Sequence, residues 1–561
     1  MKKYRVLSLM LAFVMVITLA SCGKQSTQQE QASSNDTTAA EQSTAENDES
    51  WKTGEPTKIS WFRSGISQKC LANWADAEWV KELEKRMNVS IEFQGPKSTD
   101  DYNQAAAIML NSGTLSDIFH YNFSNYDGGV TAAIEDGIIV DVYNKYRDKV
   151  SNYYDILDKY PDIRKQVTAD DGSANIFNHV EVNMERMSYW GLGIRQDWLN
   201  KLNLQTPTTI DELENVLVAF RDQDPNGNGQ KDEIPFSDYY LAGANYMFAI
   251  MNMTAPFGML YSEVQQDPYN EGNVTYWILV NEGKAFQDCV TMLNKWYKEG
   301  LLDPEFAIQD GTALEAKVTS DRVGTTHVWP SGFNTWNAAL RKVNPDADME
   351  GLAQVTGEAG KAYSANSALV KCGSGSQGNV ITSKAEDDGS IDACLRVINY
   401  LYSEEGSDLI NWGPEGVSYT ANSDGTKSWT DTLTKDPEYS LNDLQYKYAL
   451  PTYGDWPKVM SYDAWASIEL NSEEAVRAHD AWFKADKGLL LPNLVLGADE
   501  SSEYARIMSD VNTAITENFI KFIIGTRPVS EVPQLVQQCK DLGLEDAMAM
   551  YQKAWERYNS K

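Results

Sequence analysis

The first 22 residues constrain this chain most, because they assign it to a compartment before any argument about folding begins. Basic side chains within the first five residues precede an apolar run over residues 6–20. This order is typical of a secretory leader, and the run is short for a membrane-spanning helix. Small residues stand directly before Cys22. We predict a lipoprotein signal peptide over residues 1–21 and a lipid on Cys22, at the extracellular face of the cytoplasmic membrane. The alternative is an ordinary secretory leader in which the cysteine is incidental.

The segment after Cys22 has the composition of a linker. Residues 23–50 contain no aromatic residue and almost no large aliphatic one. Such a segment buries too little apolar surface to offset the entropy lost on ordering. We therefore predict that residues 22–54 form a flexible tether, which would hold a globular body close to a partner in the membrane.

From residue 51 on, the chain has the composition of a globular protein. Its length of about 500 residues exceeds what a single core usually serves, so we expect at least two lobes. The net charge of −33 argues against nucleic acid and anionic lipid surfaces as partners. The remaining cysteines show no metal-ligand or redox spacing, and we expect small buried apolar residues with one disulfide at most. They are Cys70, Cys289, Cys372, Cys394 and Cys539.

Short apolar runs alternate with longer segments of helical period, which indicates an α/β architecture. The expected strands are residues 58–62, 89–93, 138–142 and 379–381. The clearest helix covers residues 209–221, with Thr208 or Thr209 as its cap and one apolar face. Residues 504–558 are expected to form successive amphipathic helices, broken at residues 525–528 and at Gly543.

The segment DQDPNGNGQKDEIP, residues 222–235, carries an oxygen-bearing side chain at every second position from Asp224. This spacing, with a glycine turn at residue 229, is typical of a loop that wraps a hard cation. Position twelve is Pro235 where an EF-hand has its glutamate, so Glu233 takes that role or leaves it to water. We predict a structural calcium site; the alternative is a solvated Asn-Gly turn. The expected ligands are Asp224, Asn226, Asn228, Gln230, Asp232 and Glu233.

Four segments in order carry a resemblance over nearly the whole chain. They are GLGIRQDWLNKLNLQTPTTIDEL at 191–213, the loop just described, NWGPEGVSYT at 411–420 and ENFIKFIIGTRPVSEVPQLVQQCKDLGLEDAMAMYQKAWERY at 517–558. The chain resembles the family 1 extracellular solute-binding lipoproteins, the capture components of Gram-positive carbohydrate ABC importers. The resemblance is greatest to the subgroup with calcium-containing alginate-oligosaccharide-binding proteins.

The resemblance implies an α/β, two-lobed periplasmic-binding-protein fold of type II, with a hinge between the lobes and a helical C-terminal portion. By analogy, lobe 1 takes residues 55–180 and 327–378, and lobe 2 takes residues 181–326 and 379–561, including the calcium loop. The crossings are then expected near residues 175–187, 325–329 and 373–379. A monomer would bind an oligosaccharide between the lobes, and the transmembrane subunits of an ABC permease would read the closed form.

Sugar recognition needs aromatic faces for the apolar side of a pyranose and planar polar groups for its hydroxyls. Expected loops supply both types: one group follows the first expected strand, a second flanks a Pro-Ser-Gly segment near an expected crossing, and a third clusters around two glycines. The expected ligand-binding residues are Trp61, Arg63, Trp329, Trp336, Trp412, Glu415 and Tyr419. For Trp412 and Tyr419 a purely structural role is an equal alternative. Arg195 and Asp197 are expected to form a structural pair.

The competing function is a secreted carbohydrate-active enzyme, a lyase or glycosidase. With 81 acidic residues, a pair of carboxylates at catalytic separation arises by accident, so acidic counts decide nothing. No nucleophile elbow or zinc-helix motif is present in the sequence, and we expect no enzyme activity.

Among the 4 histidines, His327 beside Trp329 is the candidate for a functional role, although a hydrogen-bonded residue near the core is the simpler interpretation. A peptide- or siderophore-binding lipoprotein on the same fold is a further alternative. The acidic surface favours a neutral glycan over a polyuronate unless the cleft holds a basic patch.

Overall fold

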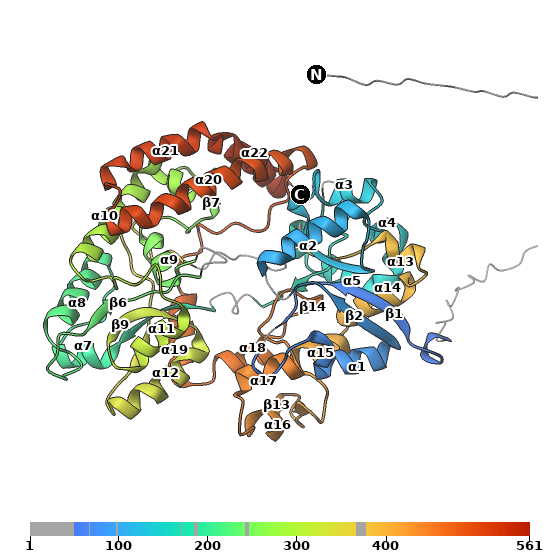
Figure 1. Ribbon diagram of the computed structural model, residues 1–561, viewed down its shortest axis with the longest axis horizontal. Coiled ribbons are helices and arrows are strands. Elements are labelled where there is room, and N and C mark those ends of the chain that lie inside the picture. The colour runs from blue at the N-terminus through green and yellow to red at the C-terminus, as the bar shows by residue number, and fades with distance from the viewer. Residues whose placement is uncertain are drawn as a thin grey trace, which may run out of the picture. The chain divides into compact units, whose positions relative to one another are not determined.

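The computed structural model describes residues 50–66, 68–96, 99–169, 171–183, 189–241, 246–365 and 377–560. Cys22, the predicted signal peptide and most of the predicted tether lie outside these ranges, as does Cys372. Residues 51–561 form one compact unit (Figure 1). Within the described part of the chain, no helix is long and apolar enough to cross a bilayer.

The first sheet has the strand order β11-β3-β1-β2. Its strands are β1 (Thr57–Phe62), β2 (Val89–Gln94), β3 (Ile118–Asn122) and β11 (Gln377–Ile381). β1 runs parallel to both β2 and β3, and β11 is antiparallel to β3. Successive residues of a strand point to opposite faces, so Trp61 and Phe62 enter two different apolar clusters. The sheet and the elements packed on it are called lobe 1 here.

The faces of the first sheet are covered by short helices. α2 (Thr99–Ser112) and α3 (Gly129–Glu135) pack on the face of Phe62. The face of Trp61 is covered by α1 (Glu78–Met87), α5 (Ser151–Lys159), α6 (Pro161–Val167), α13 (Ser383–Asp387), α14 (Ile391–Leu401) and α15 (Glu404–Trp412). Both faces are therefore buried, as expected for a sheet of mostly parallel strands.

The second sheet has the strand order β10-β5-β9-β6 and is the centre of lobe 2. Its strands are β5 (Gly191–Arg195), β6 (Ile234–Phe236), β9 (Val323–Val328) and β10 (Met349–Leu352). Around it lie α7 (Gln196–Leu202), α8 (Ile210–Asp222), α9 (Phe248–Thr254), α10 (Lys284–Lys298), α11 (Gly311–Thr319), α12 (Pro330–Val343) and α19 (Glu473–Phe483).

The C-terminal part is helical, as predicted. α20 (Ala498–Ile524), α21 (Val532–Asp541) and α22 (Leu544–Ser560) follow one another, and the breaks fall at Gly525 and Gly543, which both have positive φ. α20 begins earlier than the sequence suggested. These helices are red in Figure 1 and contribute to the core of lobe 2, where α20 and α21 lie beside α10 and α22 packs on α20.

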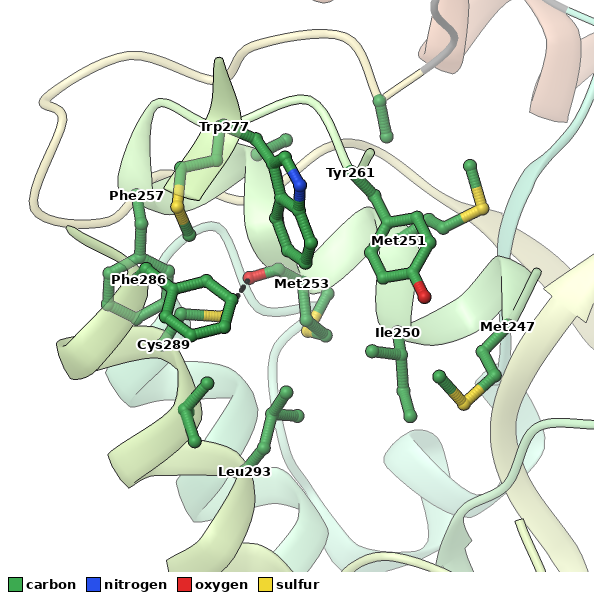
Figure 2. Close-up of a cluster of buried hydrophobic side chains, with 14 of the residues drawn as sticks. Met247, Ile250, Met251, Met253, Phe257, Tyr261, Trp277, Phe286, Cys289 and Leu293 are labelled. Carbon is green, nitrogen blue, oxygen red and sulfur yellow. Dashed lines mark hydrogen bonds between the residues drawn. The ribbon is translucent and has the colours of Figure 1, made fainter. Parts of the chain in front are cut away.

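Figure 2 shows part of that core, where side chains of α9 and α10 meet. Phe286 and Leu293 of α10 pack near Met253 and Trp277, and the thiol of Cys289 donates to the carbonyl oxygen of Met253 over 3.7 Å. Cys289, Cys394 and Cys539 are buried and Cys70 is half-buried, and all four are free thiols. The prediction of small buried cysteines thus holds for three of the four described positions.

Local predictions succeeded where capping and periodicity decide the structure. Thr209 is the N-cap of α8, its side chain accepts from the backbone N–H of Glu212, and Glu212 completes a capping box. The strands expected at residues 58–62, 89–93 and 379–381 are β1, β2 and β11. The strand expected at 138–142 is wrong: Ile139 forms only an isolated bridge with Thr382, and the chain turns into α4 (Val142–Lys145).

The expected division into lobes needs correction. β9 continues through Val328, and β10 pairs with β5, so residues 327–352 lie in lobe 2 and not in lobe 1. Conversely β11, α14 and α15 belong to lobe 1, where sequence reasoning placed lobe 2. The chain passes from lobe 1 to lobe 2 after Val180, and returns between Ala365 and β11. It reaches lobe 2 again by α19, which packs on β10.

Candidate ligand-binding cleft

A cavity of about 1220 Å³ lies between elements of the two lobes. Lobe 2 contributes Tyr189, which precedes β5, together with Trp329 and Trp336 at the start and in the first half of α12. Lobe 1 contributes the segment around His179 in β4 (His179–Val180) and the loop before β14 (Lys458–Val459). β4 and β14 pair in parallel, which places residues distant in sequence along one wall.

Two aromatic rings form an exposed platform in this cavity. The rings of Tyr189 and Trp329 are stacked, with centroids 5.8 Å apart and an interplanar angle of 19°. Each residue is 37% exposed, whereas most tryptophans of the described chain are buried. An exposed pair of large aromatic faces inside a concave site is an arrangement that binds ligands with flat apolar sides.

The platform rests on a second layer of rings. His327 stacks on Phe248 with centroids 4.7 Å apart, and both rings approach Trp329 at steep angles. His327 is 2% exposed, and neither ring nitrogen has a hydrogen-bond partner. Burial lowers the pKa of His327 to about 3, so the ring is neutral. The expectation of a hydrogen-bonded histidine near the core is therefore wrong in one respect: the residue is buried, but no hydrogen bond satisfies it.

Polar groups line the remainder of the cavity. Glu181 and Asp455 come from lobe 1, and Glu469 ends α18 (Tyr462–Glu469). The backbone N–H of Ser331 in α12 donates to Glu469 over 3.3 Å, a direct link between α18 and lobe 2. Burial raises the pKa of Asp455. These groups provide hydrogen-bonding partners for hydroxyls around an aromatic platform.

Of the predicted ligand-binding residues, the structure brings Trp329 and Trp336 to the cavity. Trp61 is fully buried, donates from Nε1 to Asn379 over 2.9 Å, and packs against Trp456. Arg63 is buried as well, with its guanidinium carbon 3.4 Å from the ring centroid of Trp456, and burial lowers its pKa to about 10. Trp61 and Arg63 thus build the core of lobe 1 and do not line the cavity.

The third predicted group also lies elsewhere. Trp412 and Tyr419 form a small buried cluster with Ala464, and the ring of Trp429 lies beside that of Trp412 at an interplanar angle of 40°. Glu415 is exposed on the turn between Trp412 and Tyr419 and does not line the cavity. The glycines at 413 and 416 have positive φ, so the turn motif that suggested a ligand loop instead shapes the end of α15.

Sequence reasoning missed Tyr189, Trp465, Glu181 and Asp455, which line the cavity. Tyr189 had one usable signal, because it stands directly before the Gly191 segment of the family resemblance. Asp455 and Glu181 reach the site only through the pairing of β4 with β14, which no local pattern reveals. Arg195 and Asp197, predicted as a structural pair, form two parallel hydrogen bonds of 2.8 and 2.6 Å.

A second cavity of about 780 Å³ lies on another side of the crossing segments. It is lined by α3, by the hairpin of β7 (Val264–Gln266) and β8 (Val274–Tyr276), and by α20 and α22. Beside it the hydroxyl of Ser502 in α20 donates to Asp127 over 2.6 Å and accepts from the backbone N–H of Gly128. Asn493 lines both cavities, so the connecting segment of residues 491–496 separates them.

The loop at residues 224–233 folds around its own carboxylates. Asp224 accepts from the backbone N–H groups of Gly227 and Gly229, at 3.0 and 3.1 Å. The side-chain amides of Asn226 and Asn228 both donate to Asp232. Glu233 has a buried carboxylate oxygen without a hydrogen-bond partner, and burial together with the neighbouring Asp224 and Asp232 raises its pKa.

These features fit a cation that would satisfy the orphaned Glu233 oxygen and offset the repulsion of three carboxylates. In the part of the chain that is described, no three His, Cys, Asp or Glu side chains converge as a metal site, so amide and carbonyl oxygens would have to complete the shell.

The fold is that of solute-binding proteins. A crystal structure of the alginate-binding protein AlgQ2 without calcium ion matches with a TM-score of 0.71 and 24% identity over 90% of this chain and 99% of that one. The substrate-binding protein FusA of Streptococcus pneumoniae, in complex with kestose, matches with a TM-score of 0.70 and 21% identity over 90% and 100%. A structure of a FusA EF-hand mutant also matches this chain. The chain therefore has the fold of these solute-binding proteins.

Two named proteins match most of the chain in sequence. It is 23% identical to the fructooligosaccharide ABC transporter substrate-binding protein FusA of S. pneumoniae, over 86% of this chain and 87% of that protein. It is 21% identical to the polygalacturonan/rhamnogalacturonan-binding protein YtcQ of Bacillus subtilis, over 99% of both. The chain is thus a homologue of the substrate-binding proteins of carbohydrate ABC transporters, which confirms the resemblance in the sequence. No family model matches it.

Proposed function

We propose that this protein captures an oligosaccharide in the 1220 Å³ cleft and delivers it to the transmembrane subunits of an ABC permease. The observation that carries the proposal is the stacked, exposed pair of Tyr189 and Trp329 inside that cleft. A pyranose or furanose ring presents C–H groups on its flat side, and an aromatic face replaces water there without loss of hydrogen bonds. The surrounding carboxylates and amides then serve the hydroxyls at the ring edge.

The protein acts by binding, without chemistry on the ligand. The proteins to which it is similar are named as binding proteins, and two carboxylates of the cleft have structural partners. Glu181 accepts from the backbone of Asn183, and Glu469 accepts from that of Ser331. A glycosidase would need a carboxylic acid and a carboxylate free to act on opposite sides of one bond. The enzyme alternative predicts shortened products after incubation, which the experiment below detects.

The loop of Asp224, Asn226, Asn228, Gln230, Asp232 and Glu233 is proposed to hold a structural calcium ion. The support is the buried oxygen of Glu233 without a partner and the neighbouring Asp224 and Asp232, which together with burial raise the pKa of Glu233. The matching AlgQ2 structure is one without calcium ion, and one matching FusA structure is an EF-hand mutant. When bound, the ion would supply positive charge that ties the end of α8 to β6, because the loop connects these two elements.

We further propose that Cys22 carries a lipid that anchors a monomer at the extracellular face of the cytoplasmic membrane. The support is the leader and the small residues before Cys22. The polar stretch up to residue 50 would let the folded part reach a permease while the lipid holds it nearby.

The test is isothermal titration of the soluble chain, beginning at Gly23, against a panel of oligosaccharides, followed by analysis of the products. We expect saturable binding with intact ligand. Trp329→Ala is expected to weaken binding by about 2 kcal/mol, roughly thirtyfold, because the aromatic face is lost. Trp555→Ala is the matched control, since Trp555 stacks on Tyr558 in α22, away from the cleft. Binding that survives Trp329→Ala unchanged would reject this cleft, and shortened products would favour the enzyme.

A further inference from the structure

The side chains around the cleft carry an uneven set of charges. Among the described residues that line it, the acidic ones are Glu181, Glu315, Asp443, Asp455 and Glu469, and the one Lys or Arg is Lys69. The carboxylates come from both lobes and surround the platform of Tyr189 and Trp329. A charged ligand therefore enters a field of negative sign, in a concave site where screening by solvent is reduced.

Three cations in or beside the cleft, Lys69, Arg63 and Lys458, are committed to other partners. Lys458 is fully buried, and its ammonium donates to the backbone oxygen of Leu450. The ammonium of Lys69 lies 3.3 Å from the carboxylate of Asp443, and its side chain is 75% exposed. Arg63 lies flat over Trp456 and also faces Trp74, with centroid distances of 3.4 and 5.3 Å. Its Nη1 donates to the backbone oxygen of Asp455 over 3.4 Å, and the residue is 1% exposed. Its guanidinium cannot offer the bidentate fork that recognises a carboxylate.

Two of the carboxylates are held in place, one by burial and one by a hydrogen bond. Glu181 is 2% exposed. Glu469 is fixed by the N–H of Ser331, the residue that follows Pro330 in α12. A uronate carboxylate on the ligand would lose its water and meet like charges, and no cation of the described lining is free to compensate it. A hydroxyl or a methyl ester at the same ring position would instead donate to these carboxylates or remain neutral.

Similarity to known proteins does not decide this point. YtcQ and AlgQ2 are named for acidic polymers, and FusA is named for fructooligosaccharides. The charges of the described lining favour an uncharged ligand. We propose that the ligand is an oligosaccharide without carboxylate groups, and that the carboxylates of the cleft discriminate against uronates. This inference rests on the proposed function and deepens it, because it names the chemical class that the same cleft accepts.

The experiment compares ligands that differ only in charge. Each neutral oligosaccharide of the panel is paired with its C6-oxidised counterpart, in which the primary alcohol has become a carboxylate, and each oligogalacturonate with its methyl ester. Titrations of the chain from Gly23 are run at low and at high salt. We expect the uncharged member of the binding pair to bind at least tenfold more tightly at low salt. The gap should narrow as salt increases, because salt screens repulsion.

Two outcomes contradict the proposal in distinguishable ways. Equal or tighter binding of the charged member overturns the charge discrimination and leaves an oligosaccharide-binding function intact. No binding by any oligosaccharide overturns the proposed function together with this inference.

A variant test assigns the discrimination to the carboxylates of the cleft. In the double variant Asp455→Asn with Glu469→Gln, the ratio of the affinities for charged and uncharged members should rise at least threefold. Glu415→Gln, which removes an exposed carboxylate outside the cleft, should leave that ratio unchanged. Melting curves of the variants report whether each is folded, and Asp443→Asn serves as a second variant if the double variant is not. A ratio that does not move in a folded variant overturns the assignment.

Discussion

The ring of His327 meets the ring of Trp329 almost at a right angle, with centroids 5.4 Å apart and an interplanar angle of 88°. The imidazole has no hydrogen-bond partner at either nitrogen, so its contribution is that of a flat, neutral ring. It fills the space beneath the aromatic platform of the cleft together with Phe248.

We predict that His327→Ala weakens oligosaccharide binding about tenfold, because Trp329 loses the ring that holds its orientation. His327→Phe keeps a ring of similar size and should keep the affinity within about twofold. Burial keeps the pKa of His327 at about 3, so affinity should not titrate with this residue between pH 5 and 8. Titration calorimetry of both variants checks this, and a large loss in His327→Phe would show that a ring nitrogen is needed.

Asp238 predicts a pH dependence of stability. It is fully buried, its carboxylate accepts from the backbone N–H groups of Tyr239 and Ile250, and burial raises its pKa to about 7. The unfolded carboxyl loses its proton near pH 4, whereas the folded one keeps it to about pH 7. The contribution to stability is therefore present at low pH and is lost as the pH rises from about 4 to 7.

Asp238→Asn should remove that slope, since an amide oxygen can still accept an N–H but does not ionise. Each unit of raised pKa corresponds to about 1.4 kcal/mol, so the difference in unfolding free energy between pH 5 and 8 should shrink measurably. Urea unfolding across this range is the measurement. The exposed Asp346→Asn should leave the slope as it is, and an unchanged slope in Asp238→Asn would contradict the assignment.

The calcium proposal predicts that a chelator lowers the melting temperature by roughly 2–5 °C, because an ion present at a hundred times its Kd adds about 2.7 kcal/mol to a folded unit of about 500 residues. Asp224→Ala should have the lower melting temperature and no response to chelator. The turn at Asn422 to Thr426 provides a control of similar design: Asp424 accepts from the backbone N–H of Thr426 over 3.0 Å. Asp424→Ala should keep the full chelator response.

Trp456 is the centre of an aromatic cluster in lobe 1. The rings of Trp61, Trp74 and Trp79 lie within 5.1 Å of its centroid, and Arg63 lies over its face. Trp456→Ala should cost about 3–5 kcal/mol of unfolding free energy, because a large cavity forms and Arg63 loses its partner. Trp456→Phe should cost less. Chemical unfolding measures both, with Trp555→Ala as the control that leaves the cluster intact.

Cys22→Ala is predicted to remove the lipid. Cells producing the variant should release the protein into the medium or fail to process the leader, and labelling with radioactive palmitate should disappear. The wild-type chain should stay with the membrane fraction. Retention of the label in the variant would show that another residue carries it.

The sequence predicted those parts of the fold that depend on neighbours along the chain. Thr209 and Glu212 form a capping box within four residues, and the helix breaks at Gly525 and Gly543 need only a positive φ. Parts that depend on sheet order were not visible. The last residues of β9 looked like a crossing, but they continue a ladder with β5, and the partner strand lies more than a hundred residues away.

The site was predicted only in part for the same reason. Trp61 and Arg63 stand at the end of the first strand, where a cleft residue was expected. Trp61 instead enters an apolar cluster on one face of the sheet, and Arg63 packs against Trp456 inside lobe 1. Whether a residue at the end of a strand faces a cleft depends on what packs over it, and here the cover comes from residues near 456. Trp329 was predicted because it stands beside Pro330 near an expected crossing between the lobes. In the structure it is instead the N-cap of α12, with Pro330 at the first position of that helix.

The way the core of lobe 2 is assembled has a consequence for how the protein is made. That core joins residues 190–365 to side chains of the last helices, among them Phe519 and Phe522. A chain exported with its N-terminus first cannot complete lobe 2 until the final 60 or so residues have crossed the membrane. Until then Phe286 and Trp277, which pack on Phe519, remain open to proteases and chaperones at the cell surface. The C-terminal helices therefore make full-length synthesis a condition for a complete lobe 2, and a copy that ends before them would leave this core exposed.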